Sequence, residues 1–175
     1  MILLLEILHR TRRSTLSHTP NRAVRETSMI VFVLRHADRS SEDDALSAVG
    51  TKRARILAHM LAESGVSKAF CSDAQRTHQT LAPLKQELGD RISVTEFSTA
   101  GQAGLDGHVE AVVAAIKALP PDTIAVAVSH SNTVGSVVEG LGGGRIDAIG
   151  DTEFDRLLVL FIPPNGRETL LQLHY

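Results

Sequence analysis

The sequence predicts a three-layer α/β/α sandwich with a mostly parallel central sheet and an antiparallel hairpin at the C-terminal edge. Two continuous apolar runs, 30–34 and 124–128, are typical of buried parallel strands. Stretches with the apolar spacing of helices alternate with the strand-like runs, as in an α/β fold. Near the C-terminus, Asn165-Gly166 lies between two further apolar runs and is a strong hairpin signal.

The first strand, 30–34, ends abruptly where charge appears, at Arg35 and His36. A polar loop follows, and Ser47 is then a good N-cap for a helix. Apolar residues continue at helical spacing until Gly65, which supplies a stop.

The second strand is predicted at 66–71 and the third at 92–94, with a helix between them. Ser72 is the expected cap of that helix, and Gly89 is its expected end. A loop is predicted from Ser98 to His108.

The second half of the chain repeats this alternation. A helix over 109–119 stops before two prolines, and the strand 123–129 runs straight into a histidine. A helix is expected over 132–141, closed by glycines. The final strands, 154–162 and 168–174, form the hairpin.

Composition narrows the function classes. The chain has 175 residues, a formal net charge of −2 and 43% hydrophobic residues, so nothing favours nucleic-acid or membrane partners. Cys71 is the only cysteine, which excludes an intrachain disulfide and fits a reducing compartment such as the cytoplasm.

Residues 1–28 differ from the rest because five arginines oppose two glutamates there. We expect a flexible basic extension, and a single α/β domain over 29–175. Met29 directly precedes the first strand, so residues 1–25 should be dispensable for folding.

Two predicted strands each deliver a histidine at their carboxyl end, His36 and His130. Arg35 adjoins the first, and Arg76 lies just inside the helix that follows the second strand. Ligands of open α/β sheets bind beyond the carboxyl ends of the strands, so these four side chains should converge. Asn132, near a helix start, would add backbone N–H donors.

Such a cluster predicts an anion pocket, and phosphate suits it because guanidinium groups donate bidentate hydrogen bonds to phosphate oxygens. We interpret His36 as a nucleophile that accepts a phosphoryl group.

The chain resembles the histidine phosphatase superfamily, which also contains the cofactor-dependent phosphoglycerate mutases. Four segments carry the resemblance, in order, between residues 30 and about 145: Leu34-Arg35-His36-Ala37, Leu46-Ser47-Ala48-Val49-Gly50, Ser72-Asp73-Ala74-Gln75-Arg76-Thr77-His78-Gln79-Thr80 and Val128-Ser129-His130-Ser131-Asn132-Thr133. It implies a metal-independent hydrolase without cofactor that works through a phosphohistidine on His36. Arg35, Arg76, His130 and Asn132 would then hold the phosphate.

The resemblance also implies a general acid, and Glu96 lies at the corresponding distance beyond Arg76. Asp38, Asp106 and Glu110 remain alternatives. The substrate would be a small phosphoester or a phosphohistidine protein. The short loop at 38–45 counts against phosphoglycerate-mutase-type transfer, which stays open beside a non-catalytic phospholigand-binding role.

Other kinds of site are disfavoured. A metal site from His36, Asp38 and His130 would place a dication beside two arginines. Ser129 and Ser131 lack the glycine frame of a serine hydrolase nucleophile. The glycines at 142–144 follow a helix and do not open one, so they indicate a helix stop.

Overall fold

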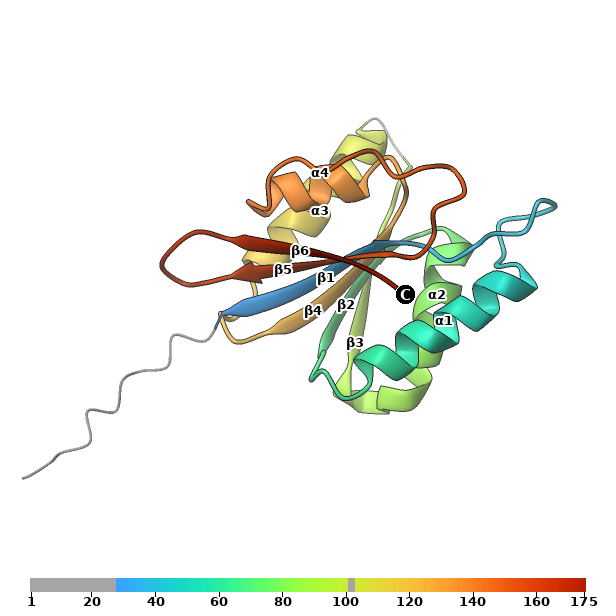
Figure 1. The fold of residues 1–175 in the computed structure, drawn as a ribbon, viewed down its shortest axis with the longest axis horizontal. Coiled ribbons are helices and arrows are strands. Elements are labelled where there is room, and N and C mark those ends of the chain that lie inside the picture. Colours follow the sequence, from blue (N-terminus) through green and yellow to red (C-terminus); the bar gives the residue numbers. More distant parts are fainter. Residues whose placement is uncertain (1–27, 101–102) are drawn as a thin grey trace, which may run out of the picture.

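The computed structural model describes residues 28–100 and 103–175 (Figure 1). The predicted N-terminal extension falls outside the described residues, apart from its last residue. The strands are β1 (Met29–Arg35), β2 (Lys68–Ser72), β3 (Ser93–Phe97), β4 (Ile124–Ser129), β5 (Arg156–Ile162) and β6 (Thr169–His174). The helices are α1 (Ala48–Leu61), α2 (Gln75–Leu88), a short 3₁₀ turn (Gly89–Arg91), α3 (Gly104–Lys117) and α4 (Val134–Gly140).

The strands form one six-stranded sheet in the order β3-β2-β4-β1-β5-β6. The pairs β1–β4, β2–β4 and β2–β3 are parallel, whereas β1–β5 and β5–β6 are antiparallel. The predicted sheet, mostly parallel with an antiparallel C-terminal edge, is therefore confirmed. Its centre is β4 beside β1, the two strands whose carboxyl ends carry histidines.

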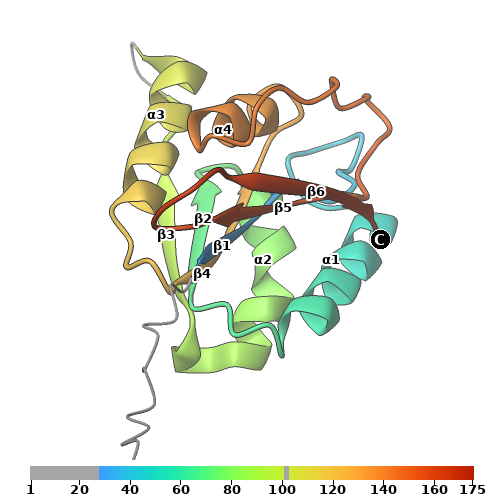
Figure 2. The ribbon, with the colours of Figure 1, turned by 60° about the vertical axis from the view of Figure 1, so that its left-hand side comes forward.

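Helices cover both faces of the sheet, which gives the three predicted layers. Figure 2 shows α3 and α4 on one face and α1 and α2 on the other. Each face has its own apolar core, centred on Val137 and Ile116 on the α3/α4 side and on Leu57 and Leu84 on the α1/α2 side. Among the residues that the structure describes, no helix is long and apolar enough to cross a membrane.

Three helix starts differ from the prediction, including that of α4, which begins at Val134 and not at Asn132. The N-cap of α2 is Ala74 and not Ser72, and its side chain supplies no cap hydrogen bond. Instead, the Asp44 carboxylate accepts a hydrogen bond from the Gln75 backbone N–H at 2.6 Å. The helix α3 begins at Gly104, within the segment that was predicted to be a loop. The loop was predicted because glycine lowers helix propensity.

The start of α1 agrees with the prediction, since the Ser47 side chain accepts a hydrogen bond from the Gly50 N–H at 3.1 Å. Gly50 also packs against the loop that follows β1. A Cβ atom at this position would lie 2.0 Å from the backbone oxygen of Asp38. Only glycine therefore lets α1 approach the chain just beyond His36 so closely.

We expect Gly50→Ala to lower the free energy of unfolding by about 2–3 kcal/mol, because α1 or the Asp38 backbone must move. Urea unfolding of the variant and the wild type measures the difference. Gly135→Ala in α4 is the matched control, since its nearest neighbour, an Ile146 side-chain carbon, is 3.6 Å from the added Cβ. Equal stability of all three proteins would contradict the close-packing argument.

Candidate active site

The structure brings the two strand-end histidines together. Arg35 pairs in register with Ser129, so His36 and His130 follow neighbouring parallel strands at the same level. Their ring centroids are 5.5 Å apart, in an edge-to-face arrangement, and both residues are buried. Residues separated by more than ninety positions in the sequence thus share one end of the sheet.

The ring of His36 is held in one tautomer. Its Nδ1 lies 2.8 Å from the Ala37 carbonyl oxygen, and a carbonyl only accepts, so Nδ1 carries the proton. Burial lowers the pKa of His36 to about 3, and the neighbouring cation Arg76 acts in the same direction. The imidazole is therefore neutral near pH 7, and its Nε2 keeps a free lone pair.

His130 is held at both ring nitrogens. The Arg76 guanidinium donates from Nη2 to Nδ1 at 3.0 Å, which leaves the proton on Nε2. Nε2 in turn donates to the Ser72 hydroxyl at 3.0 Å. Burial, with a further contribution from Arg76, lowers the pKa of His130 to about 4.

Arg35 is anchored by the loop before β5. Its Nη1 donates to the backbone oxygens of Gly150, Asp151 and Glu153 at 2.8, 2.9 and 3.1 Å. Its guanidinium carbon lies 3.9 Å from the centre of the Phe154 ring, a cation–π contact. These contacts fix the guanidinium beside the two histidines.

Each of the two guanidinium groups has a buried nitrogen without a partner. Among the described residues, the Nε atoms of Arg35 and Arg76 are buried and make no hydrogen bond. A buried, unsatisfied, charged donor is costly, and native proteins rarely leave one unpaired. Two such donors beside a neutral imidazole are suited to an oxyanion with several acceptor oxygens.

Arg76 forms an ion pair with a carboxylate of the same chain that was not predicted from the sequence. Its Nη1 pairs with Asp44, a residue of the loop between β1 and α1. The second Asp44 oxygen caps α2, so the first N–H of that helix is already engaged. This loop therefore both caps α2 and holds the Arg76 side chain.

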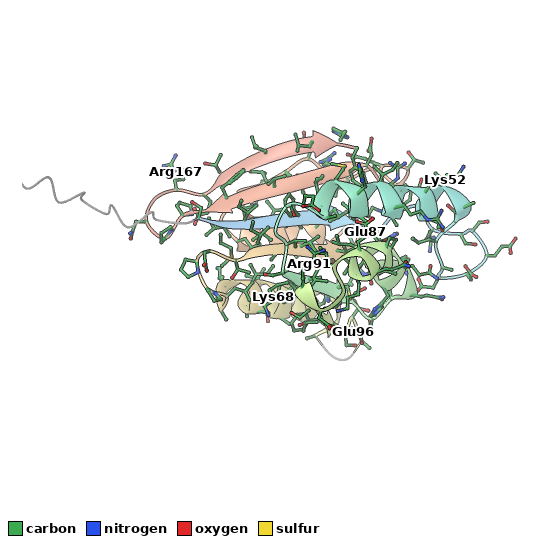
Figure 3. All side chains as sticks on the ribbon, turned by 90° about the horizontal axis from the view of Figure 1, so that it is seen from below. Lys52, Lys68, Glu87, Arg91, Glu96 and Arg167 are labelled. Carbon is green, nitrogen blue, oxygen red and sulfur yellow. The ribbon has the colours of Figure 1, made fainter. Side chains whose placement is uncertain are left out.

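The remaining predicted site residues lie farther out. Asn132 is exposed in the turn before α4 and lines a cavity there. Glu96 lies on the edge strand β3, half exposed, and forms an ion pair with His78 at 2.8 Å (Figure 3). Among the alternative acids, Asp38 is paired with Arg53 at 2.6 Å. The other two, Asp106 and Glu110, are exposed on α3.

His108, expected from the sequence at the end of a loop, belongs to the hydrogen-bond network behind His130. It is 1% exposed, and its Nε2 lies 3.0 Å from the Ser129 hydroxyl. Ser129 in turn contacts the Thr133 hydroxyl, which accepts from the His130 backbone N–H. The signal in the sequence was its spacing of four and eight residues from Val112 and Ile116, the buried face of α3.

One family model matches part of the chain. Residues 31–97, which include most of β1, the Ser47-capped helix and Arg76, match the model of the histidine phosphatase superfamily (branch 1). The resemblance to the histidine phosphatase superfamily is confirmed. Among curated proteins, none matches the sequence.

Solved structures of two phosphatases and of a phosphoglycerate mutase share the fold. The protein histidine phosphatase SixA, complexed with tungstate, is 24% identical with a TM-score of 0.59, over 83% of this chain and 97% of that one. A mycobacterial glucosyl-3-phosphoglycerate phosphatase is 14% identical, with a TM-score of 0.58 over 83% and 97% of the two chains. The phosphoglycerate mutase of Plasmodium falciparum is 15% identical, with a TM-score of 0.58 over 84% and 91%. At these identities the likeness shows the fold alone.

The lowered histidine pKa values predict how stability depends on pH. Both pKa values, about 3 for His36 and about 4 for His130, lie below the ordinary 6.5. At a pH between the folded-state pKa of each ring and 6.5, that ring is therefore protonated in the unfolded chain and neutral in the folded chain. The free energy of unfolding should therefore fall as pH drops below 6.5, by up to roughly 1.4 kcal/mol per pH unit for each ring.

Urea unfolding at pH 7, 6 and 5 measures this slope. His36→Gln, which does not titrate, should show a shallower slope than the wild type. His59→Gln, an exposed position on α1, is the matched control and should keep the wild-type slope. An unchanged slope in His36→Gln would contradict a neutral buried imidazole.

Proposed function

We propose that this protein is a metal-independent phosphatase that works through a phosphohistidine on His36. The observation that carries the proposal is the bare Nε2 of a neutral, buried His36 beside two guanidinium groups whose Nε donors are unpaired. The family assignment supports a phosphatase or mutase-like role. The proposed substrate is a small phosphoester or a phosphohistidine of a protein.

In the proposed first step, the lone pair on Nε2 of His36 forms a bond to phosphorus while the bond to the leaving oxygen or nitrogen breaks. Arg35 and Arg76 neutralise the charge on the three transferring oxygens. The neutral His130 donates its Nε2–H to one of these oxygens in place of the Ser72 hydroxyl, with Asn132 at the rim. In the second step, the oxygen of a water molecule bonds to phosphorus while the N–P bond breaks. The bonding pair returns to Nε2, so His36 is neutral again with its proton on Nδ1. The attacking water gives up a proton to solvent, and inorganic phosphate leaves.

The leaving group needs a proton unless it departs readily as an anion or a neutral base. Glu96 is the proposed acid for alkoxide leaving groups, although its ion pair with His78 keeps it at the sheet edge. This position supports a preference for easily departing groups, such as a phenolate or the imidazole of a phosphohistidine. We also propose a cytoplasmic location, which a single, unpaired and buried Cys71 supports.

A turnover screen tests the proposal. The panel contains phenyl phosphate, glycerol 2-phosphate, 3-phosphoglycerate and a phosphohistidine protein, each with and without EDTA. We expect rapid phosphate release from phenyl phosphate and the phosphohistidine protein and slower release from glycerol 2-phosphate, unchanged by EDTA and competitively inhibited by vanadate. Release from none of the four, or loss with EDTA, would contradict the proposal.

The same screen on Glu96→Gln tests the acid. We expect a loss of about tenfold or more on glycerol 2-phosphate and little change on phenyl phosphate, because only the alkoxide requires a proton. Equal behaviour on both substrates would assign the acid to another group.

A further inference from the structure

A cavity beside α4 is lined by residues adjacent in sequence to those of the proposed anion site. We propose that this cavity is a leaving-group subsite that accepts neutral or cationic groups and disfavours a second anion. This inference rests on the proposed phosphatase function and adds the substrate class to it.

The position of the cavity is the first argument. It has a volume of about 310 Å³ and is lined by residues of the turn before α4, of α4 itself and of the segment 145–149 that leads toward β5. Two of the lining residues, Ser131 and Asn132, directly follow His130. Another, Ile149, directly precedes Gly150, whose carbonyl oxygen accepts from Arg35 at 2.8 Å. The lining therefore adjoins, along the chain, two segments of the anion site.

The lining is the second argument. Ser136 and Asn132 offer uncharged hydrogen-bond partners, and Ile146 with Ile149 offers apolar contact. The volume lies near the lower limit of about 300–1,000 Å³ for small-molecule sites. One ring with a short substituent suits a space of this size and mixed lining.

Charge is the third argument and decides the class of ligand. The charged residues that line the cavity are Glu139, Asp147 and Arg145. Arg145 pairs with Glu139 at 3.4 Å, so these two opposite charges offset each other. Asp147 then leaves one net negative charge on the cavity, and a carboxylate on the leaving group would be repelled while an ammonium would be attracted.

This charge separates two classes of substrate. A phosphoglycerate carries a carboxylate close to its phosphate and would meet the Asp147 side of the cavity unfavourably. A phosphorylated imidazole, a phenol or an amino-substituted alcohol carries no such charge. The cavity therefore favours hydrolysis of the second class over mutase-type use of the first.

Three aryl phosphates test the inference with the full chain: phenyl phosphate, 4-carboxyphenyl phosphate and 4-(aminomethyl)phenyl phosphate. We expect kcat/KM for the aminomethyl compound to exceed that for the carboxy compound by roughly tenfold at low salt. Asp147→Asn should reduce this ratio to about threefold or less.

The control is Glu87→Gln, which removes a carboxylate from α2 on the opposite face of the sheet and should keep the wild-type ratio (Figure 3). Equal rates on the charged compounds, or an unchanged ratio in Asp147→Asn, would overturn the subsite while phenyl phosphate turnover upholds the phosphatase. Absence of turnover on all three compounds would overturn both.

Discussion

Replacing His36 by alanine should lower kcat/KM for phenyl phosphate by at least about a thousandfold, because the nucleophile itself is lost. In the wild type, the Ala37 carbonyl oxygen holds the Nδ1 proton at 2.8 Å and leaves Nε2 bare. Burial lowers the pKa of the ring to about 3, so the neutral form is fully present at pH 7. No other side chain with a free nucleophilic nitrogen is expected to replace it at phosphorus.

The assay is steady-state phosphate release, with urea unfolding to verify that the variant is folded. His59→Ala is the matched control, because His59 is an exposed histidine on α1, away from the sheet end. It should retain wild-type activity. A His36→Ala protein that is folded and fully active would remove the nucleophile assignment, and with it the phosphohistidine intermediate.

Arg76→Ala should lower kcat/KM by about a hundred- to a thousandfold, the usual cost of one preorganised donor to a developing oxyanion. Arg76 supplies the buried Nε that lacks a partner, and its Nη2 holds Nδ1 of His130 at 3.0 Å. Its loss therefore removes a phosphate donor and frees the ring of His130. It also leaves the Asp44 carboxylate unpaired near the site.

Arg76→Lys separates charge from geometry in the same assay. Lysine keeps the positive charge but cannot reach His130, Asp44 and an oxyanion at once, so we expect only partial recovery. Arg55→Ala, which removes an exposed arginine of α1, should have no effect. Full activity in Arg76→Lys would show that a point charge suffices, and full activity in Arg76→Ala would contradict the anion site.

The fold could be predicted because its signals are local. The apolar run from Ile30 to Leu34, the Ser47 cap and the turn at Asn165-Gly166 each depend on a few adjacent residues, and the structure has the corresponding strand, helix and hairpin. The prediction was wrong at the start of α2, because its cap comes from Asp44, 31 residues before Gln75. When the capping residue is distant in the sequence, the residues next to the helix carry no signal of the cap.

By itself, the sequence determined that His36 and His130 follow buried strands, and therefore that both lie at the carboxyl edge of the sheet. Only the tertiary structure decided their chemistry: the tautomer of each ring, the unpaired Nε atoms of the arginines and the burial of His108. The physical reason is the separation in sequence of the residues that interact. Strand and helix signals arise from neighbouring residues, whereas hydrogen bonds and desolvation at this site join residues up to 118 positions apart.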